Sequence, residues 1–164
     1  MLTRGSGKIL ITGQLGEVMK ESAQIAVSLV KSMFPEKAKL FSENDLHIHV
    51  PEGAVPKDGP SAGITMTTAI ASLVTGKPVS PKIAMTGEVS LRGVVTAIGG
   101  LPEKLLAAQR SGVTTVLIPR ENLEDLADVS PEVLDAMEIL PVDEVSEVLA
   151  KTGILPDGTM DEVG

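Results

Sequence analysis

The chain has 164 residues, of which 43% are hydrophobic, enough for the core of one domain of ordinary size. Its formal net charge of −8 argues against binding to nucleic acid or to an anionic membrane surface through this domain. It contains no cysteine, which excludes disulfides, cysteine metal ligands and a cysteine nucleophile.

The first half of the chain shows two hydrophobic periods. An apolar run bounded by glycines predicts a strand over 8–12, and helical spacing of apolar residues predicts a helix over 17–33. Strict alternation over 46–50 predicts a half-buried strand. A run of small and apolar residues over 61–75 then predicts a buried helix.

The second half predicts four strands and four helices, most of them short. The strands are expected at 82–85, 88–95, 113–118 and 137–142, and the helices at 101–110, 123–127, 131–136 and 145–151. Strands and helices do not alternate strictly, so we predict an α+β fold of mixed small sheets with packed helices. The domain is expected to cover 1–152, followed by a disordered tail over 153–164.

A serine stands between a turn and the predicted helix 61–75, in the stretch PKDGPSAGITM (56–66). Ser61 can cap the helix, which needs no further function. It can also be a nucleophile, because the free N–H groups of Ser61 and Ala62 would face a developing oxyanion. A serine nucleophile needs a base. The residues alone leave two arrangements open, a Ser-Lys pair and a Ser-His-Asp set using His47 or His49 with Asp58.

Lys104 is the candidate for the lysine base. It lies near the start of the helix that Gly99 and Gly100 open, where a cation is unfavourable because the helix dipole is positive there. Burial at that point would lower its pKa and allow it to act as a general base. Buried lysines are rare, however, so sequence statistics favour a solvated side chain.

Two other motifs resemble ligand-binding sites, one for phosphate and one for a metal, but each lacks residues that such a site needs. Gly5-Ser6-Gly7-Lys8 is not a phosphate-binding loop, because Leu2 occupies the position of the first glycine and Ile9 that of the Ser or Thr. His47 and His49 share one face of a strand, yet no third metal ligand is signalled nearby. We therefore predict no metal, and polar or cleft-lining roles for the histidines.

Longer stretches of the chain resemble the proteolytic domain of Lon, the bacterial ATP-dependent protease. They follow the order of that family and cover most of residues 5–150: ITGQLGEVMKESAQIA (11–26), HIHVPEGAVPKDGPSAGITM (47–66), AMTGEVSLRGVVTAIGGLPEKLLAAQRSGVTTVLIPRENLEDL (84–126) and VDEVSEVL (142–149). The resemblance implies the Lon proteolytic-domain fold, which also occurs in a small-subunit ribosomal protein.

The resemblance also implies roles for individual residues. The serine of PKDGPSAG, Ser61, would be the nucleophile, and the lysine of GGLPEKLLAA, Lys104, would be the base. The threonine of MTGE, Thr86, would orient the lysine amine, while His47 and Asp58 would support the cleft. This reverses the statistical expectation for Lys104. The implied activity is that of a serine endopeptidase acting on unfolded or damaged proteins.

The same resemblance implies a setting for the domain. Lon carries an ATPase module with ATP and magnesium, of which this sequence shows no motif, so we expect no cofactor in this chain. Lon assembles into a hexameric ring in the cytoplasm, and its domain has further strands, with a cleft acid, upstream of the part matched here. Two alternatives to the endopeptidase remain. One is a non-catalytic oligomerisation or scaffold domain of the same fold, and the other is a Ser-His-Asp esterase.

Overall fold

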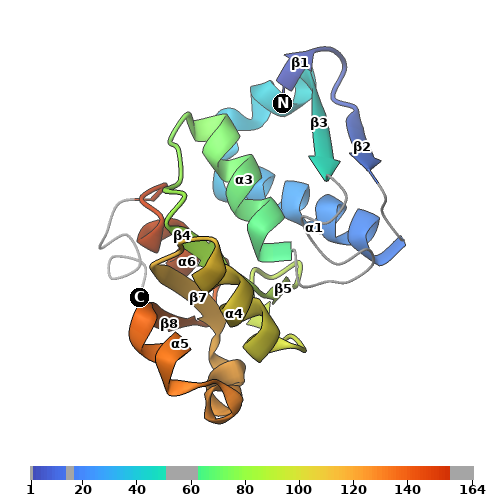
Figure 1. Cartoon of the computed structure of the whole chain (residues 1–164). Coiled ribbons are helices and arrows are strands. Elements are labelled where there is room, and N and C mark those ends of the chain that lie inside the picture. The colour runs from blue at the N-terminus through green and yellow to red at the C-terminus, as the bar shows by residue number, and fades with distance from the viewer. Residues whose placement is uncertain (1, 14–16, 51–62, 156–164) are drawn as a thin grey trace.

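The computed structural model describes residues 2–13, 17–50 and 63–155 (Figure 1). Within these ranges the chain forms two groups of elements, each built on a small three-stranded sheet. No helix in the described ranges is long and apolar enough to cross a membrane. The fold is α+β, as the sequence predicts.

The first group contains the N-terminal sheet and the helices packed beside it. The strands are β1 (Leu2–Arg4), β2 (Ile9–Gly13) and β3 (Asn44–Val50), with β3 in the centre. β1 pairs antiparallel with β3, and β2 pairs parallel with it. The helical elements are α1 (Glu17–Met33), the 3-10 turn η1 (Pro35–Lys37), α2 (Ala38–Glu43) and α3 (Gly63–Thr75). Helices α1 and α3 pack directly against each other (Figure 1).

The second group contains a parallel sheet in which β7 lies between β4 and β8. Its elements, in chain order, are β4 (Ile83–Met85), β5 (Glu88–Val89), β6 (Val95–Thr96), α4 (Leu101–Arg110), β7 (Thr115–Pro119), the 3-10 helix η3 (Arg120–Asp128), α5 (Pro131–Ala136), β8 (Glu138–Val142) and α6 (Val145–Lys151). β5 and β6 form a separate antiparallel pair. The short strands of the sheet all run the same way, so their carboxyl ends share one edge.

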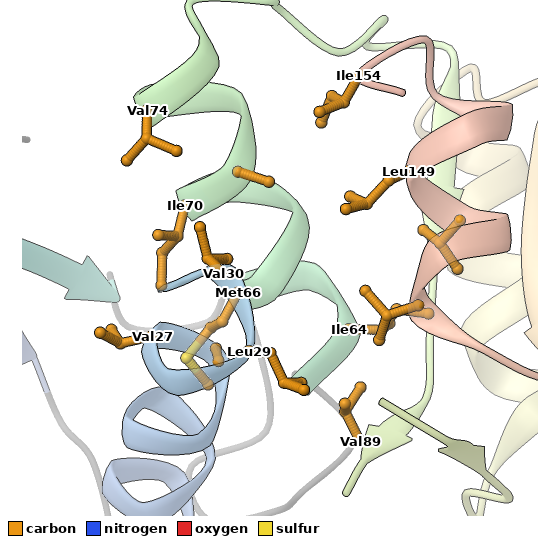
Figure 2. Packing of buried hydrophobic residues seen from close by; sticks show 14 of the residues in the cluster. Val27, Leu29, Val30, Ile64, Met66, Ile70, Val74, Val89, Leu149 and Ile154 are labelled. Carbon is orange, nitrogen blue, oxygen red and sulfur yellow. The ribbon is translucent and has the colours of Figure 1, made fainter. Parts of the chain in front are cut away.

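Strand β7 separates two hydrophobic cores, because its side chains alternate between the two faces of the sheet. Leu117 belongs to the larger core, whereas Val116 and Ile118 belong to the smaller one. The larger core is centred on α3, which buries residues around most of its circumference against α1, β5 and α6 (Figure 2). The smaller core packs Leu101 and Leu105 of α4 against β7 and α5. Helix α4 is thereby attached to the sheet by a stripe of i, i+4 leucines.

The predicted helices 17–33, 101–110, 131–136 and 145–151 match the structure, whereas two predicted segments differ and two observed ones were not predicted. The expected strand 88–95 is a hairpin, β5 and β6, whose turn is closed by the Ser90 hydroxyl, which accepts the N–H groups of Arg92 and Val94. The helix predicted at 123–127 is the longer 3-10 helix η3. Strand β1 and the helical residues 35–43 were not predicted.

The chain also stays packed beyond the expected domain end at residue 152. Ile154 is fully buried in the larger core, and its N–H donates to the carbonyl of Leu149. The Lys77 ammonium donates to the carbonyl of Ile154 at 3.2 Å. The folded part therefore includes residues 153–155, because Ile154 and Leu155 both pack on the larger core. The rest of the expected tail lies outside the described residues.

Candidate active site

Thr86 lies at the carboxyl edge of the parallel sheet. It directly follows β4, and its N–H donates to the carbonyl of Leu117 on the neighbouring strand at 3.1 Å. The residue is 8% exposed, so its side chain is almost completely buried. Thr86 therefore has a backbone fixed to β7 and a buried side chain at the end of β4.

The start of α3 packs onto this same segment. The N–H of Ile64 donates to the carbonyl of Gly87 at 3.2 Å, and the hydroxyl of Thr65 donates to the carbonyl of Met85 at 3.3 Å. A Cβ atom at Gly63 would stand 3.1 Å from the backbone nitrogen of Val89, so the missing side chain permits the close approach. The helix that follows the PKDGPSA stretch thus begins beside Thr86.

Gly87 makes the contact possible from the other side. Its φ is +157°, and a Cβ atom there would stand 2.7 Å from the Cγ1 atom of Val95. A side chain at this position would push against Val95 of the β5–β6 hairpin, while Ile64 of α3 lies in ordinary contact at 3.7 Å. The pair Thr86-Gly87 is therefore held from three directions, by β7, by α3 and by the hairpin.

Lys104 is the fourth residue of α4, as the predicted helix 101–110 places it. Gly100 caps the helix in the left-handed region, with φ of 71°, and its carbonyl accepts the N–H of Lys104 at 3.2 Å. Lys104 lies between Leu101 and Leu105 in sequence and borders the stripe that these leucines bury. Its own side chain is half-buried as a result.

Burial lowers the pKa of Lys104 below the ordinary lysine value of 10.5. No carboxylate within the described ranges pairs with its ammonium to oppose that shift. It is the one lysine or arginine of the described residues whose pKa is resolved as lowered. The side chain that sequence statistics expect in solvent is therefore one for which the charged form is penalised.

Only some of the other predicted site residues lie in the described ranges. Ser61, Ala62 and Asp58 lie outside the described residues. His47 lies half-buried on β3 of the first sheet, opposite Leu10 of β2 in the register. No group of three or more His, Cys, Asp or Glu side chains in the described ranges is placed to hold a metal ion.

Asn122 is a polar residue of the second group that the sequence did not single out. It is 2% exposed, in η3, and its amide bonds both the N–H and the carbonyl of Ile98. Its position in a polar helical stretch gives no sign of burial, because the partner is 24 residues away in sequence.

A sequence profile of the Lon protease (S16) C-terminal proteolytic domain matches residues 1–154. The chain belongs to this family. The resemblance found in the motifs is thus confirmed, together with the α+β fold of the Lon proteolytic domain. The chain is a proteolytic domain of the Lon serine-protease family.

Lon proteases of several organisms are similar to this chain along most of its length. That of Clostridium beijerinckii is 61% identical over 148 residues, which are 90% of this chain and 19% of that protein. That of Methanosphaera stadtmanae is 56% identical over 151 residues, 91% of this chain and 18% of the relative. The Lon protease of Methanosarcina barkeri is 52% identical over 147 residues. The chain therefore spans about a fifth of the length of these Lon proteases.

Proposed function

We propose that this Lon domain hydrolyses peptide bonds with Ser61 as nucleophile and Lys104 as general base. The observation that carries the proposal is the half-buried Lys104, whose pKa burial lowers and whose ammonium has no acidic partner among the described residues. A general base at neutral pH must lose its proton readily, and burial shifts Lys104 in that direction by lowering its pKa. Membership of the Lon family supplies the matching serine in PKDGPSAG.

The reaction would run in two halves. Neutral Lys104 takes the Ser61 proton while the serine oxygen bonds to the scissile carbonyl carbon, and the N–H groups of Ser61 and Ala62 stabilise the oxyanion. The tetrahedral intermediate collapses, the C–N bond breaks, and the Lys104 ammonium returns its proton to the leaving amine. Water, deprotonated by Lys104, then attacks the acyl-enzyme and releases the acid and Ser61.

Thr86 would orient the Lys104 amine through its hydroxyl. The support is that its backbone is bound to β7 at the carboxyl edge of the sheet and that its side chain is buried there. His47 and Asp58 would support the cleft without acting as the main base. The Ser-His-Asp esterase remains the alternative chemistry, and the non-catalytic scaffold remains the alternative function.

The assembly and the substrates concern the complete protein, and we propose them from its similarity to Lon proteases. We infer a homohexameric ring in the cytoplasm that degrades unfolded or damaged polypeptides delivered by an ATPase module with ATP and magnesium. This domain itself would bind neither nucleotide nor nucleic acid, for which its net charge of −8 is unfavourable.

A fluorophosphonate probe tests the proposed dyad. Attack by Ser61 forms an O–P bond, releases fluoride and passes the serine proton to Lys104. We expect labelling of the wild type that is lost in Ser61→Ala and retained when His47 and His49 are both replaced. A folded protein that stays unlabelled would favour the scaffold, and loss of labelling in a folded double histidine variant would favour the esterase.

The pH dependence of labelling is expected to follow Lys104. Because the pKa of Lys104 is lowered, the folded chain releases this proton at a pH where free lysine still holds it. The labelling rate should therefore rise with pH through a midpoint below 10.5 and level off above it. A rate that instead follows a histidine-like midpoint and vanishes with the histidines would contradict the assignment.

Replacing Thr86 with valine should slow labelling by about fivefold, which corresponds to the loss of one orienting hydrogen bond of about 1 kcal/mol. Valine keeps the shape of the side chain and removes only the hydroxyl. Thr86→Ser is the matched control, since it keeps the hydroxyl and should retain most of the rate. Equal rates for the valine and serine variants would show that the hydroxyl plays no part.

A further inference from the structure

The side chain of Asn122 is bound at every polar atom. Its Oδ1 accepts the N–H of Ile98 at 3.0 Å, and its Nδ2 donates to the carbonyl of Ile98 at 2.9 Å. The second Nδ2 hydrogen goes to Oδ2 of Asp125 at 2.6 Å. An amide has two N–H donors, and both are used here. The orientation of the amide is thus fixed by Asp125, and the amide in turn fixes Ile98.

Ile98 stands just before the helix that carries Lys104. Only Gly99 and Gly100 separate it from the first residue of α4. A Cβ atom at Gly99 would meet nothing within 4 Å, and Gly100 takes up a left-handed conformation. Two glycines in succession impose little restraint of their own. The contact with Asn122 is therefore the anchor from which the chain enters α4.

Apolar packing alone would not fix this entry point to the accuracy that catalysis needs. Leu101 and Leu105 hold α4 against β7, but hydrophobic contact is non-directional and tolerates small shifts along the helix axis. Hydrogen bonds weaken steeply away from their preferred angle, so a pair of them to one residue defines both position and direction. Lys104 lies on the first turn after this anchor, where its N–H bonds Gly100.

We propose that Asn122 is a positioning residue, which holds the start of α4 through Ile98 and so places the Lys104 amine for attack on the Ser61 proton. The inference rests on the proposed Ser-Lys dyad. It adds a residue that touches neither substrate nor reacting atoms, and it assigns the 3-10 helix η3 a part in catalysis.

The test is Asn122→Ala in the complete polypeptide that contains this chain, assayed with the fluorophosphonate probe. A misplacement of about 1 Å can cost about 10²-fold in rate, so we expect the maximal labelling rate to fall by about that factor. The probe concentration at half-maximal rate should stay unchanged, because Asn122 is 2% exposed and its amide is bonded to Ile98 and Asp125. Hydrogen exchange at the amides of 99–104 should become faster.

Asn44→Ala is the matched control. The Nδ2 atom of Asn44 also donates to a backbone carbonyl, that of Leu40 at 3.0 Å, but in the first group of elements. The same substitution there removes a similar bond far from α4 in the chain, and labelling should be unaffected. Asp125→Ala is a milder variant. It keeps both hydrogen bonds between Asn122 and Ile98 and removes only the acceptor that fixes the orientation of the Asn122 amide. It should show a smaller fall in the same direction.

The outcomes separate the two proposals. A folded Asn122→Ala protein with unchanged labelling rate, or with an equal loss in Asn44→Ala, overturns the positioning role. If Asn122→Ala does not fold, Asp125→Ala decides, and an unchanged rate in that variant overturns it as well. If the wild type is not labelled, the proposed dyad is wrong. Hydrogen exchange still tests the anchor, which is overturned by unchanged exchange at 99–104.

Discussion

Replacing Lys104 with alanine is expected to reduce fluorophosphonate labelling of Ser61 by about 10²- to 10⁴-fold, the usual contribution of a general base. The fold should survive. Lys104 has no ion pair to lose among the described residues, and its charged form is penalised by burial. Alanine is also the best helix former, and it removes a cation from the positive end of the helix dipole. Thermal unfolding should show a protein at least as stable as the wild type.

The sign of the pH effect on stability gives a second check on Lys104. A lysine whose pKa is lower in the folded than in the unfolded state makes the unfolded chain bind more protons between those two values. The wild type should therefore gain stability relative to Lys104→Ala as pH rises through the lowered pKa toward 10.5. Lys151→Ala, an exposed lysine on α6, is the control and should leave labelling unchanged. Full labelling of folded Lys104→Ala would refute the dyad.

Leu105→Ala should have the largest effect on stability of the variants considered, lowering the free energy of unfolding by about 2–5 kcal/mol. Leu105 is 1% exposed and packs in the smaller core between α4, β7 and α5. Its truncation removes buried methyl groups and leaves a cavity whose walls are held by the sheet. Urea unfolding should show a lower midpoint with an unchanged slope.

Leu106→Ala is the matched control, because it is the same substitution one residue further along the same helix. Leu106 is 38% exposed, so the change should cost far less, within about 1 kcal/mol. Below the unfolding midpoint, Leu105→Ala should also label more slowly than Leu106→Ala, since it loosens the attachment of α4 that carries Lys104. Equal stabilities of the two variants would contradict the arrangement of this core.

The sequence alone determined the elements whose signals are local. Helix α4 was predicted with its bounds because Gly100 and Gly112 flank a run with leucines at i and i+4. The buried character of α3 followed from its small and apolar residues. The motifs around Ser61, Thr86 and Lys104 also identified the family, since each is a contiguous stretch.

Only the tertiary structure decided which strands pair and which polar side chains are buried. Strand β1 has three residues, too few to show a period, and it forms because β3 offers an edge. Residue statistics favoured a solvated Lys104 and the family resemblance a catalytic one, and the side chain is half-buried because α4 lies against β7. The role of Asn122 depends on Ile98, 24 residues away. Periodicity and turns depend on residues that are neighbours in sequence. Burial and hydrogen-bond partners depend on segments that come together only in the folded chain.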